Sequence, residues 1–400
     1  MTIAPQPPSA GPSPDKSAEN GRPLHIGVDI RRAGGFGVGI YTKNLVQSLA
    51  RVGPQHRYVL VGGRENFRHL GDLGPNFRLE LYERRYDSLR SHWEYGFLLR
   101  RLGLDVFHMP HRWVPLTTPA PYVATLHDLN YVLFPPDEGS KMVDRARLWA
   151  LTRGLARAAK IIAVSQATKR DAVTHLNLPE EKFRVIYDAV DENIAQPVTD
   201  DQRRETLQRY SINEPFLLYA GRIQIHKNVP RLIEAFAYLK AQLENHWKYH
   251  NLKLIVIGDD INRFPSVRHA MMRSRTQDSI RFLGFVPLET LRVFYDQATA
   301  FVFPSLYEGF GMPPLEAMVH GTPVVTSAAS SLPEAVGEAA ELVNPENVFD
   351  IARGMRKVLL DDDYRAELRR RGFEQVRRFS WDRSAREVLE VYRSIALSRA

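Results

Sequence analysis

The chain of 400 residues contains no cysteine. Without thiols it cannot form a disulfide, use a cysteine nucleophile or hold a metal ion through thiolates. Redox chemistry through protein thiols is therefore excluded, and the composition agrees with a reducing compartment.

Long apolar runs are also missing. No stretch reaches the roughly 18 consecutive apolar residues that a membrane-spanning helix needs. The first 22 residues are rich in proline, serine, glycine and alanine, and they lack the apolar run of a signal peptide. We therefore expect residues 1–22 to be a disordered tail and the protein to stay in the cytoplasm.

The charge balance is basic, with a formal net charge of +8. Such a balance predicts an anionic partner, which can be a nucleic acid, a phosphorylated substrate or an acidic lipid surface. The basic residues are scattered and no known nucleic-acid-binding module is present, so the sequence does not favour nucleic acid.

Strand-like runs alternate with helical periods along the chain, and a polar interval at 188–209 divides them into two halves. The candidate strands are 24–30, 57–63, 77–83, 105–110, 121–127, 160–165 and 183–187, followed by 215–221, 252–258, 280–285, 299–305, 323–327 and 339–343. This alternation predicts two doubly wound, Rossmann-like α/β domains with parallel sheets, facing each other across a cleft. Ligands in such sheets bind beyond the carboxyl ends of the strands, so the loops there are the places to search.

A glycine-rich loop follows the first strand, with glycines at 34, 35, 37 and 39. It is not a complete dinucleotide fingerprint, because Ile40 stands at the third glycine position and Arg64 follows Gly62 and Gly63 where a ribose-binding acid belongs. The loop is then either a tight turn or a contact for a phosphate or sugar at the start of a helix.

Histidines end two neighbouring strands. His127 is followed by Asp128, and an imidazole there can donate to sugar hydroxyls while the acid fixes its orientation. A histidine at this position can equally be a structural hydrogen-bonding residue. His108 and His111, after the preceding strand, are weaker candidates.

In the second half, Arg222 and Lys227 follow the first strand, just before a helix. They are either solvated or, with the amides of the helix start, a clamp for a diphosphate. Glu308 and Glu316 flank the turn Gly309-Phe310-Gly311 between a strand and a helix. Carboxylates suit the vicinal hydroxyls of a sugar or ribose, although a glycosidase pair, or an ion pair of Glu316 with a surface base, is the rival interpretation.

Together these motifs resemble the family 4 retaining glycosyltransferases, which have the GT-B fold of two Rossmann-like domains. The resemblance covers nearly the whole chain after the tail. The segments that carry it are "GGFGVGIYTKNL", "LHDL", "AVSQATKRD", "YAGRIQIHKN", "LIVIGD", "IRFLGFVP", "VFPSLYEGFGMPPLEAMVHGTPVVTS" and "SSLPEAVGEAA".

The resemblance implies a role for each candidate. Arg222 and Lys227 would hold the donor diphosphate, Glu316 the ribose, and Glu308 the transferred sugar. Further implied donor contacts are the amides around Phe310, Gly311 and Met312, the loop Gly35, Phe36 and Gly37, and the segment of Phe285 and Val286 near the nucleobase. His127 would touch the sugar, and Asp128 and His108 would lie on the acceptor side. The donor phosphate would take the acceptor proton, with no metal or other cofactor.

The resemblance also implies domain boundaries. Residues 23–195 would form the acceptor-side domain and 196–380 the nucleotide-sugar-binding domain, with the helix 381–400 crossing back to the first. The sequence departs from the family at "VIYDAVDE", where a proline-asparagine-glycine form is usual before the linker. This departure concerns the geometry of the hinge.

The sequence as a whole resembles the mannosyltransferases of polysaccharide assembly. GDP-mannose is therefore the favoured donor, with UDP-sugars second, and the acceptor is expected to be a glycan or a lipid-linked saccharide. The alternative is a non-catalytic nucleotide-sugar-binding component of an assembly complex. The segment 84–112 combines arginines with aromatic and leucine side chains, and it is either a solvated basic helix or a peripheral contact with an anionic membrane at the inner face of the cell.

Overall fold

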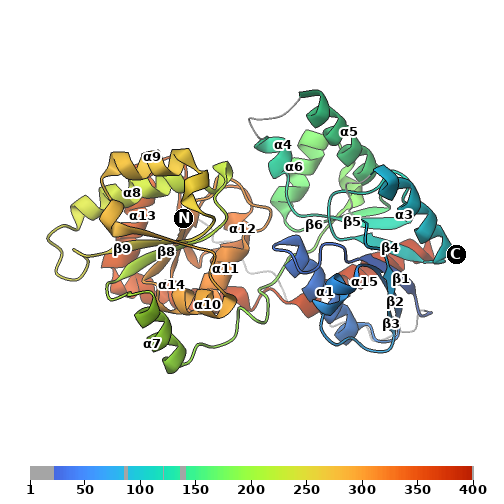
Figure 1. Cartoon of the computed structure of the whole chain (residues 1–400), viewed down its shortest axis with the longest axis horizontal. Coiled ribbons are helices and arrows are strands. Elements are labelled where there is room, and N and C mark those ends of the chain that lie inside the picture. Colours follow the sequence, from blue (N-terminus) through green and yellow to red (C-terminus); the bar gives the residue numbers. More distant parts are fainter. Residues whose placement is uncertain (1–21, 85–88, 120, 136–140, 399–400) are drawn as a thin grey trace, which may run out of the picture.

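The computed structural model describes residues 22–84, 89–119, 121–135 and 141–398, so the predicted tail lies outside the described residues except for Arg22. The described chain forms two α/β lobes (Figure 1). The N-terminal lobe contains β1 (His25–Asp29), β2 (Arg57–Gly62), β3 (Phe77–Leu81), β4 (Val106–Met109), β5 (Tyr122–Leu126), β6 (Lys160–Ala163) and β7 (Phe183–Val185). The C-terminal lobe contains β8 (Phe216–Gly221), β9 (Lys253–Gly258), β10 (Ile280–Gly284), β11 (Ala300–Phe303), β12 (Val324–Ser327) and β13 (Ala340–Val343).

Both sheets are parallel and doubly wound. Their strand orders are β3-β2-β1-β4-β5-β6-β7 and β10-β9-β8-β11-β12-β13. In each sheet the order reverses beside the first strand, at β1/β4 and at β8/β11, which is where such folds bind ligands. Each predicted strand is present, and the predicted fold class is confirmed.

Helices connect the strands and cover the sheets. In the N-terminal lobe they are α1 (Val38–Val52), α2 (Arg64–Arg68), α3 (Leu89–Arg101), α4 (Asn130–Leu133), α5 (Lys141–Arg157) and α6 (Gln166–Leu176). Those that follow are α7 (Asp200–Arg209), α8 (Val229–Gln242), α9 (Pro265–Ser274), α10 (Leu288–Gln297), α11 (Met312–Val319), α12 (Leu332–Val336), α13 (Val348–Leu360), α14 (Asp362–Val376) and α15 (Trp381–Leu397). No helix within the described ranges has the length and apolar character needed to cross a bilayer.

Strand residues of the N-terminal lobe alternate between two cores. Tyr58 and Leu60 of β2 pack on one face with α1, whereas Val59 and Val61 pack on the other face with α3 and α5. This period of two places apolar side chains on both faces, as expected for a parallel sheet between two helix layers. The C-terminal lobe has one extended core, with α8 packed against α9 and α13, and α11 against α14.

The last helix, α15, belongs to the N-terminal lobe by its contacts. It packs along α1, and Figure 1 shows it beside the first sheet, far from the strands that precede it in sequence. Trp381, Val388, Leu389 and Tyr392 are buried in the same core as α1 and β1. The apolar face of α15 therefore closes the core of the first lobe.

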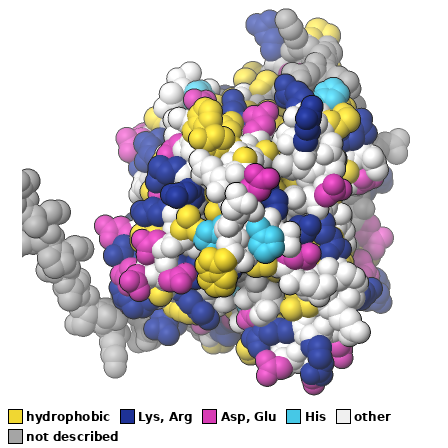
Figure 2. All heavy atoms as spheres, turned by 90° about the vertical axis from the view of Figure 1, so that its left-hand side faces the viewer, with side chains coloured by type: hydrophobic (Ala, Val, Ile, Leu, Met, Phe, Trp, Pro, Cys, Tyr) yellow, Lys and Arg dark blue, Asp and Glu magenta, His cyan; other side chains and the backbone are white. Residues whose placement is uncertain are grey.

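Figure 2 shows the outer end of the C-terminal lobe. On this face Lys and Arg side chains are interspersed with Asp and Glu. Opposite charges of the C-terminal lobe form ion pairs, for example Arg273 with Glu234 and Arg353 with Asp350. The charge on this face is therefore not gathered into a basic surface of the kind that binds a phosphate backbone.

The polar interval 188–209 is only partly a linker. Its second half folds as α7, where Thr199 accepts a hydrogen bond from the Gln202 amide, which is 3.3 Å away, in a capping box. Its first residue, Asp188, is 8% exposed, and among the described residues its Oδ1 has no hydrogen-bond partner. Burial raises the pKa of Asp188 to about 8.

We expect Asp188→Asn to stabilise the protein in a pH-dependent way. The unfolded chain releases the Asp188 proton near the usual pKa of 3.8, whereas the folded chain keeps it until about pH 8. The wild type therefore loses stability as the pH rises from about 4 to about 8, and the asparagine variant does not lose this contribution. Thermal unfolding should show a Tm advantage of a few degrees at pH 8 that shrinks towards pH 5. The exposed Asp72→Asn serves as control, and a pH-independent difference would contradict this account.

Candidate active site

An ion pair lies at the carboxyl edge of the second sheet. Lys227 ends the short 3-10 turn Ile225–Lys227 between β8 and α8, and Glu308 follows β11. The Lys227 Nζ atom is 2.6 Å from Oε1 and 2.9 Å from Oε2 of Glu308, and the side chains are 14% and 10% exposed. Ser305 Oγ also donates to Glu308 Oε1, at 2.7 Å. The structure thus joins two predicted site residues that are 81 positions apart.

Serines hold the backbone of residues 307–311, which we call the donor loop because the family resemblance implies that it contacts the donor. Ser330 and Ser331, just before α12, both donate to the Glu308 carbonyl, and Ser331 also donates to the Phe310 carbonyl. Phe310 itself is buried and stacks on Tyr187, so its ring is covered by the protein, and a donor contact of its amide stays a prediction. The loop ends at Gly311, whose φ of 111° suits glycine, and Met312 then begins α11.

Arg222 lies at the end of β8 with its side chain in solvent. The side chain is 72% exposed, and its Nε is 3.7 Å from Asp259 Oδ2. The same oxygen of Asp259 also accepts a hydrogen bond from the Ile223 amide. The guanidinium is therefore loosely held, unlike the ammonium of Lys227, and is accessible to an anionic ligand.

Glu316 lies on α11 and contacts a different partner from Glu308. Tyr295 Oη donates to its carboxylate at 2.9 Å. Burial raises the pKa of Glu316 to about 7, although the hydrogen bond from Tyr295 opposes this rise. The acid is thus partly protonated at neutral pH, and the rival prediction that it pairs with a surface base is wrong.

His127 follows β5 in the N-terminal lobe and faces the donor loop. Its Nε2 donates to the Pro110 carbonyl at 3.0 Å, and its ring meets Tyr41 edge to face. Burial lowers the pKa of His127 to about 4, so the imidazole is neutral at pH 7. A Cβ placed on Gly309 would lie 1.7 Å from the His127 carbonyl oxygen. The two lobes therefore touch where His127 and the donor loop meet.

The two residues expected on the acceptor side differ in their surroundings. Asp128 is accessible at the strand end and accepts a hydrogen bond from Arg112 at 2.8 Å. His108 is completely buried and is hydrogen-bonded to Tyr392 of α15 and to Thr125 of β5. The prediction that His108 faces an acceptor is wrong, because its imidazole joins the last helix to the sheet.

The glycine loop and the expected nucleobase segment approach each other from opposite lobes. Phe36, between Gly35 and Gly37, is 74% exposed, and its ring centroid is 5.8 Å from that of Phe285, which is 73% exposed. Val286 is instead buried in the core of the C-terminal lobe. Of the two side chains only that of Phe285 is exposed, and the contact of this segment with a nucleobase stays a prediction.

The basic segment 84–112 is mixed in character. Trp93 and Phe97 of α3 are 75% and 62% exposed, but Tyr95 is buried and donates to Asp29. Arg84 pairs with Glu94. Arg85 lies outside the described residues, as does the side chain of Arg90. Contact with an anionic membrane stays a prediction.

Sequence reasoning missed three residues that link the lobes. Ser165 and Thr168, at the start of α6, donate to the Gly309 carbonyl at 2.6 and 3.0 Å. Glu334 of α12 accepts hydrogen bonds from the amide of Gln166, at 2.8 Å, and from Tyr187 Oη, at 2.7 Å. The residues lie in "AVSQATKRD" and "SSLPEAVGEAA", but nothing in either segment alone indicates that they meet.

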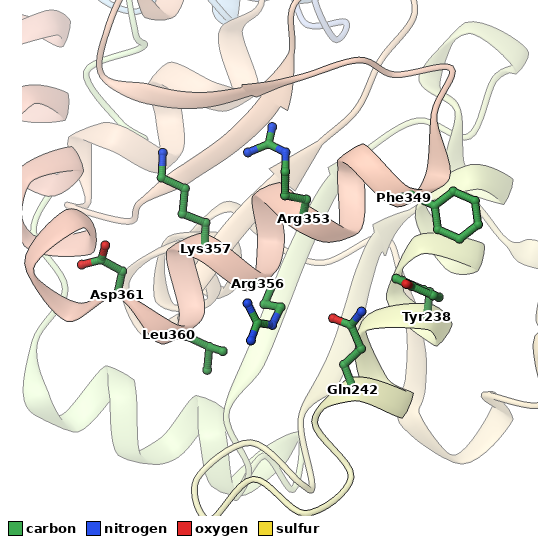
Figure 3. A pocket seen from close by; sticks show the side chains of 8 residues that line it. All are labelled: Tyr238, Gln242, Phe349, Arg353, Arg356, Lys357, Leu360 and Asp361. Atoms are coloured by element: carbon green, nitrogen blue, oxygen red, sulfur yellow. The ribbon is translucent and has the colours of Figure 1, made fainter.

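A hollow of about 860 Å³ lies elsewhere, between α8 and α13 (Figure 3). The side chains that line it are Tyr238, Gln242, Phe349, Arg353, Arg356, Lys357, Leu360 and Asp361. Two of its three cations, Arg353 and Lys357, are paired with the buried Glu341. None of the predicted site residues lines this hollow, so it is not the candidate active site.

Known proteins match both lobes. The family model described as "Glycosyltransferase Family 4" matches residues 36–194, and "Glycosyl transferases group 1" matches 202–375. The O-antigen chain mannosyltransferase B of Escherichia coli is 30% identical over 296 residues, with 72% of each chain covered. The serotype-specific mannosyltransferase WbdA of Escherichia coli is 33% identical over 235 residues, which are 58% of this chain and 28% of that relative. The chain thus matches only about a quarter of WbdA.

Among solved structures, Anabaena HepE in complex with UDP-glucose superposes with a TM-score of 0.72 at 17% identity, covering 93% of this chain and 100% of that one. This likeness supports the fold alone. The two family models, together with the match to mannosyltransferase B, establish the family. The chain belongs to the family 4 glycosyltransferases and has their GT-B fold.

Proposed function

We propose that this protein transfers a hexose, with mannose as first choice, from a nucleotide sugar to a saccharide acceptor. The observation that carries the proposal is the pair of Lys227 and Glu308 at the carboxyl edge of the second sheet, next to Gly309, which lies against the His127 backbone. The relatives named as mannosyltransferases support the choice of sugar. GDP-mannose is the favoured donor and UDP-sugars are second.

The pair is suited to hold a donor. Glu308 keeps the Lys227 ammonium in one position, and a fixed cation stabilises negative charge that develops on a departing diphosphate. Arg222, which is exposed, can close on the same diphosphate. The Glu308 oxygens accept only three hydrogen bonds from described residues, so they have capacity left for sugar hydroxyls.

The proposed reaction retains the configuration of the sugar. The bond between the sugar and the diphosphate breaks, the acceptor oxygen bonds to the same face of the sugar, and the acceptor proton passes to a phosphate oxygen of the leaving diphosphate. In this scheme the charge that must be stabilised lies on the leaving group, where two cations are available. Glu316 with Tyr295 would contact the ribose, and Asp128 the acceptor. The acceptor is proposed to be a glycan or a lipid-linked saccharide.

A thermal-shift series tests the donor site. Because a ligand that binds only the folded protein stabilises it, the true donor at about 100 times its Kd should raise the Tm by about 3 °C. We expect GDP-mannose to give a larger shift than UDP-glucose. Arg222→Ala should abolish most of the shift without changing the Tm of the ligand-free protein, since the side chain is 72% exposed.

Arg273→Ala is the matched control. Its side chain is 76% exposed, and its nearest acid, Glu234, is 3.5 Å away. This variant should keep the full shift with GDP-mannose. Equal shifts in both variants would contradict the proposed site, and release of GDP from GDP-mannose by the wild type would exclude a protein that binds without catalysis.

A further inference from the structure

The contacts of Ser165, Thr168 and Glu334 form one unit, which we name the interlobe clamp. Two buried hydroxyls of the N-terminal lobe, those of Ser165 and Thr168, converge on the carbonyl oxygen of Gly309 in the donor loop. The carboxylate of Glu334 accepts hydrogen bonds from the first amides of α6, those of Gln166 at 2.8 Å and of Ala167 at 3.3 Å. Figure 1 shows α12 and α6 facing each other between the lobes. The clamp therefore joins the donor loop and α12 to a single helix start.

The chemistry of the clamp favours a closed arrangement without making it permanent. A carboxylate on the free amides of a helix start gains both hydrogen bonds and a favourable interaction with the helix dipole. The Ser165 hydroxyl makes two hydrogen bonds. Its Oγ accepts from the Thr168 amide at 3.0 Å, and the same hydroxyl donates to the Gly309 carbonyl. If the lobes separate, α6 keeps its own cap, and water can replace the contacts that are lost.

The clamp acts on the residues of the proposed donor site through the backbone. Gly309 directly follows Glu308, and the Glu308 carbonyl is held from the other side by Ser330 and Ser331. Tyr307 of the same loop reaches into the N-terminal lobe, where its Oη accepts from the Leu129 amide at 3.2 Å. The position of Glu308 relative to His127 is thus set by contacts across the lobes.

We infer that Ser165, Thr168 and Glu334 are positioning residues for sugar transfer. They bring the donor loop of one lobe into register with His127 of the other. This inference rests on the proposed donor site at Glu308. Because the contacts of the donor lie mainly on the C-terminal lobe, the clamp serves the chemical step more than the binding of the donor.

Steady-state kinetics test the inference with GDP-mannose, or with UDP-glucose if thermal shift selects it. Glu334→Gln keeps the size of the side chain but loses its charge, and we expect kcat to fall about tenfold with the KM for the donor within twofold. Thr168→Val removes one hydroxyl from Gly309 without changing the shape, and a fall of about fivefold is expected. Glu338→Gln, an exposed change two residues beyond α12, should leave both constants unchanged.

A distance measurement separates this inference from the proposed function. Because the chain has no cysteine, spin labels can be attached at Glu65→Cys and Asp201→Cys, whose native side chains are 71% and 75% exposed in different lobes. We expect Glu334→Gln to broaden the distance distribution towards longer values. This result needs no turnover, so it stands even if neither nucleotide sugar is a substrate.

An unchanged distribution in Glu334→Gln would overturn the inference, with or without a loss of kcat, because the residue would then not act through the lobes. A rise in the KM for the donor with unchanged kcat would also overturn it.

Discussion

Lys227→Ala is expected to lower kcat for sugar transfer by about 10²- to 10³-fold, which is the usual cost of removing one group that stabilises transition-state charge. Its Nζ is the cation held at 2.6 Å from Glu308, and no other lysine contacts that carboxylate within the described chain. Release of GDP from GDP-mannose measures the effect. The exposed Lys248→Ala is the control and should retain full activity.

Loss of the ion pair should also be visible in stability. Removing Lys227 leaves a carboxylate that is only 10% exposed without its counter-charge, which costs about 3 kcal/mol. Adding Glu308→Gln to Lys227→Ala should restore most of that stability but none of the activity. Folding of each variant is checked by circular dichroism. A folded Lys227→Ala variant that turns over within threefold of wild type would show that the ammonium does not serve the reaction.

Gly309→Ala is the second change with a large expected effect. The added Cβ would lie 1.7 Å from the His127 carbonyl oxygen and 2.8 Å from its carbonyl carbon, and these backbone atoms cannot turn aside. The two lobes must then separate locally, which moves Glu308 away from His127. We expect kcat to fall at least about 10²-fold, since small displacements of catalytic groups have effects of this size.

The steric origin of this effect can be checked separately. The core of each lobe is built almost entirely from its own residues, so Gly309→Ala should unfold with a Tm within a few degrees of wild type and still bind the donor. Gly63→Ala is the control, because the nearest atom to its added Cβ is the flexible Asn66 side chain at 3.1 Å. Wild-type turnover in Gly309→Ala would mean that the contact between the loop and His127 is not required.

The sequence predicted the elements well because they repeat simple patterns. Apolar runs bounded by glycine, proline and polar residues marked each strand, and the strand-end rule placed Lys227 and Glu308 at one edge of the second sheet. The rule could not decide where a side chain points. His108 was expected on the acceptor side, but its imidazole is hydrogen-bonded to Tyr392 of α15, and in the segment expected near the nucleobase the side chain of Val286 fills a core.

The interlobe clamp was beyond sequence reasoning for a different reason. Its partners, Gln166 and Glu334, are separated by 168 positions and lie in different lobes. A serine before a helix predicts a cap, and Ser165 is indeed the cap of α6. Its second hydrogen bond, to Gly309, depends on how the two lobes meet, which no local pattern describes.

The return of α15 to the first lobe also constrains how the protein is made. Val388, Leu389 and Tyr392 of α15 are buried in a core whose buried members outside this helix all come from the first 200 residues. During synthesis the N-terminal lobe therefore lacks its last helix until α15 has been translated, although all the strands of its sheet have been made by then. The core of the C-terminal lobe contains no residue of α15, so the packing of the N-terminal lobe can be completed only after the C-terminal lobe has been translated.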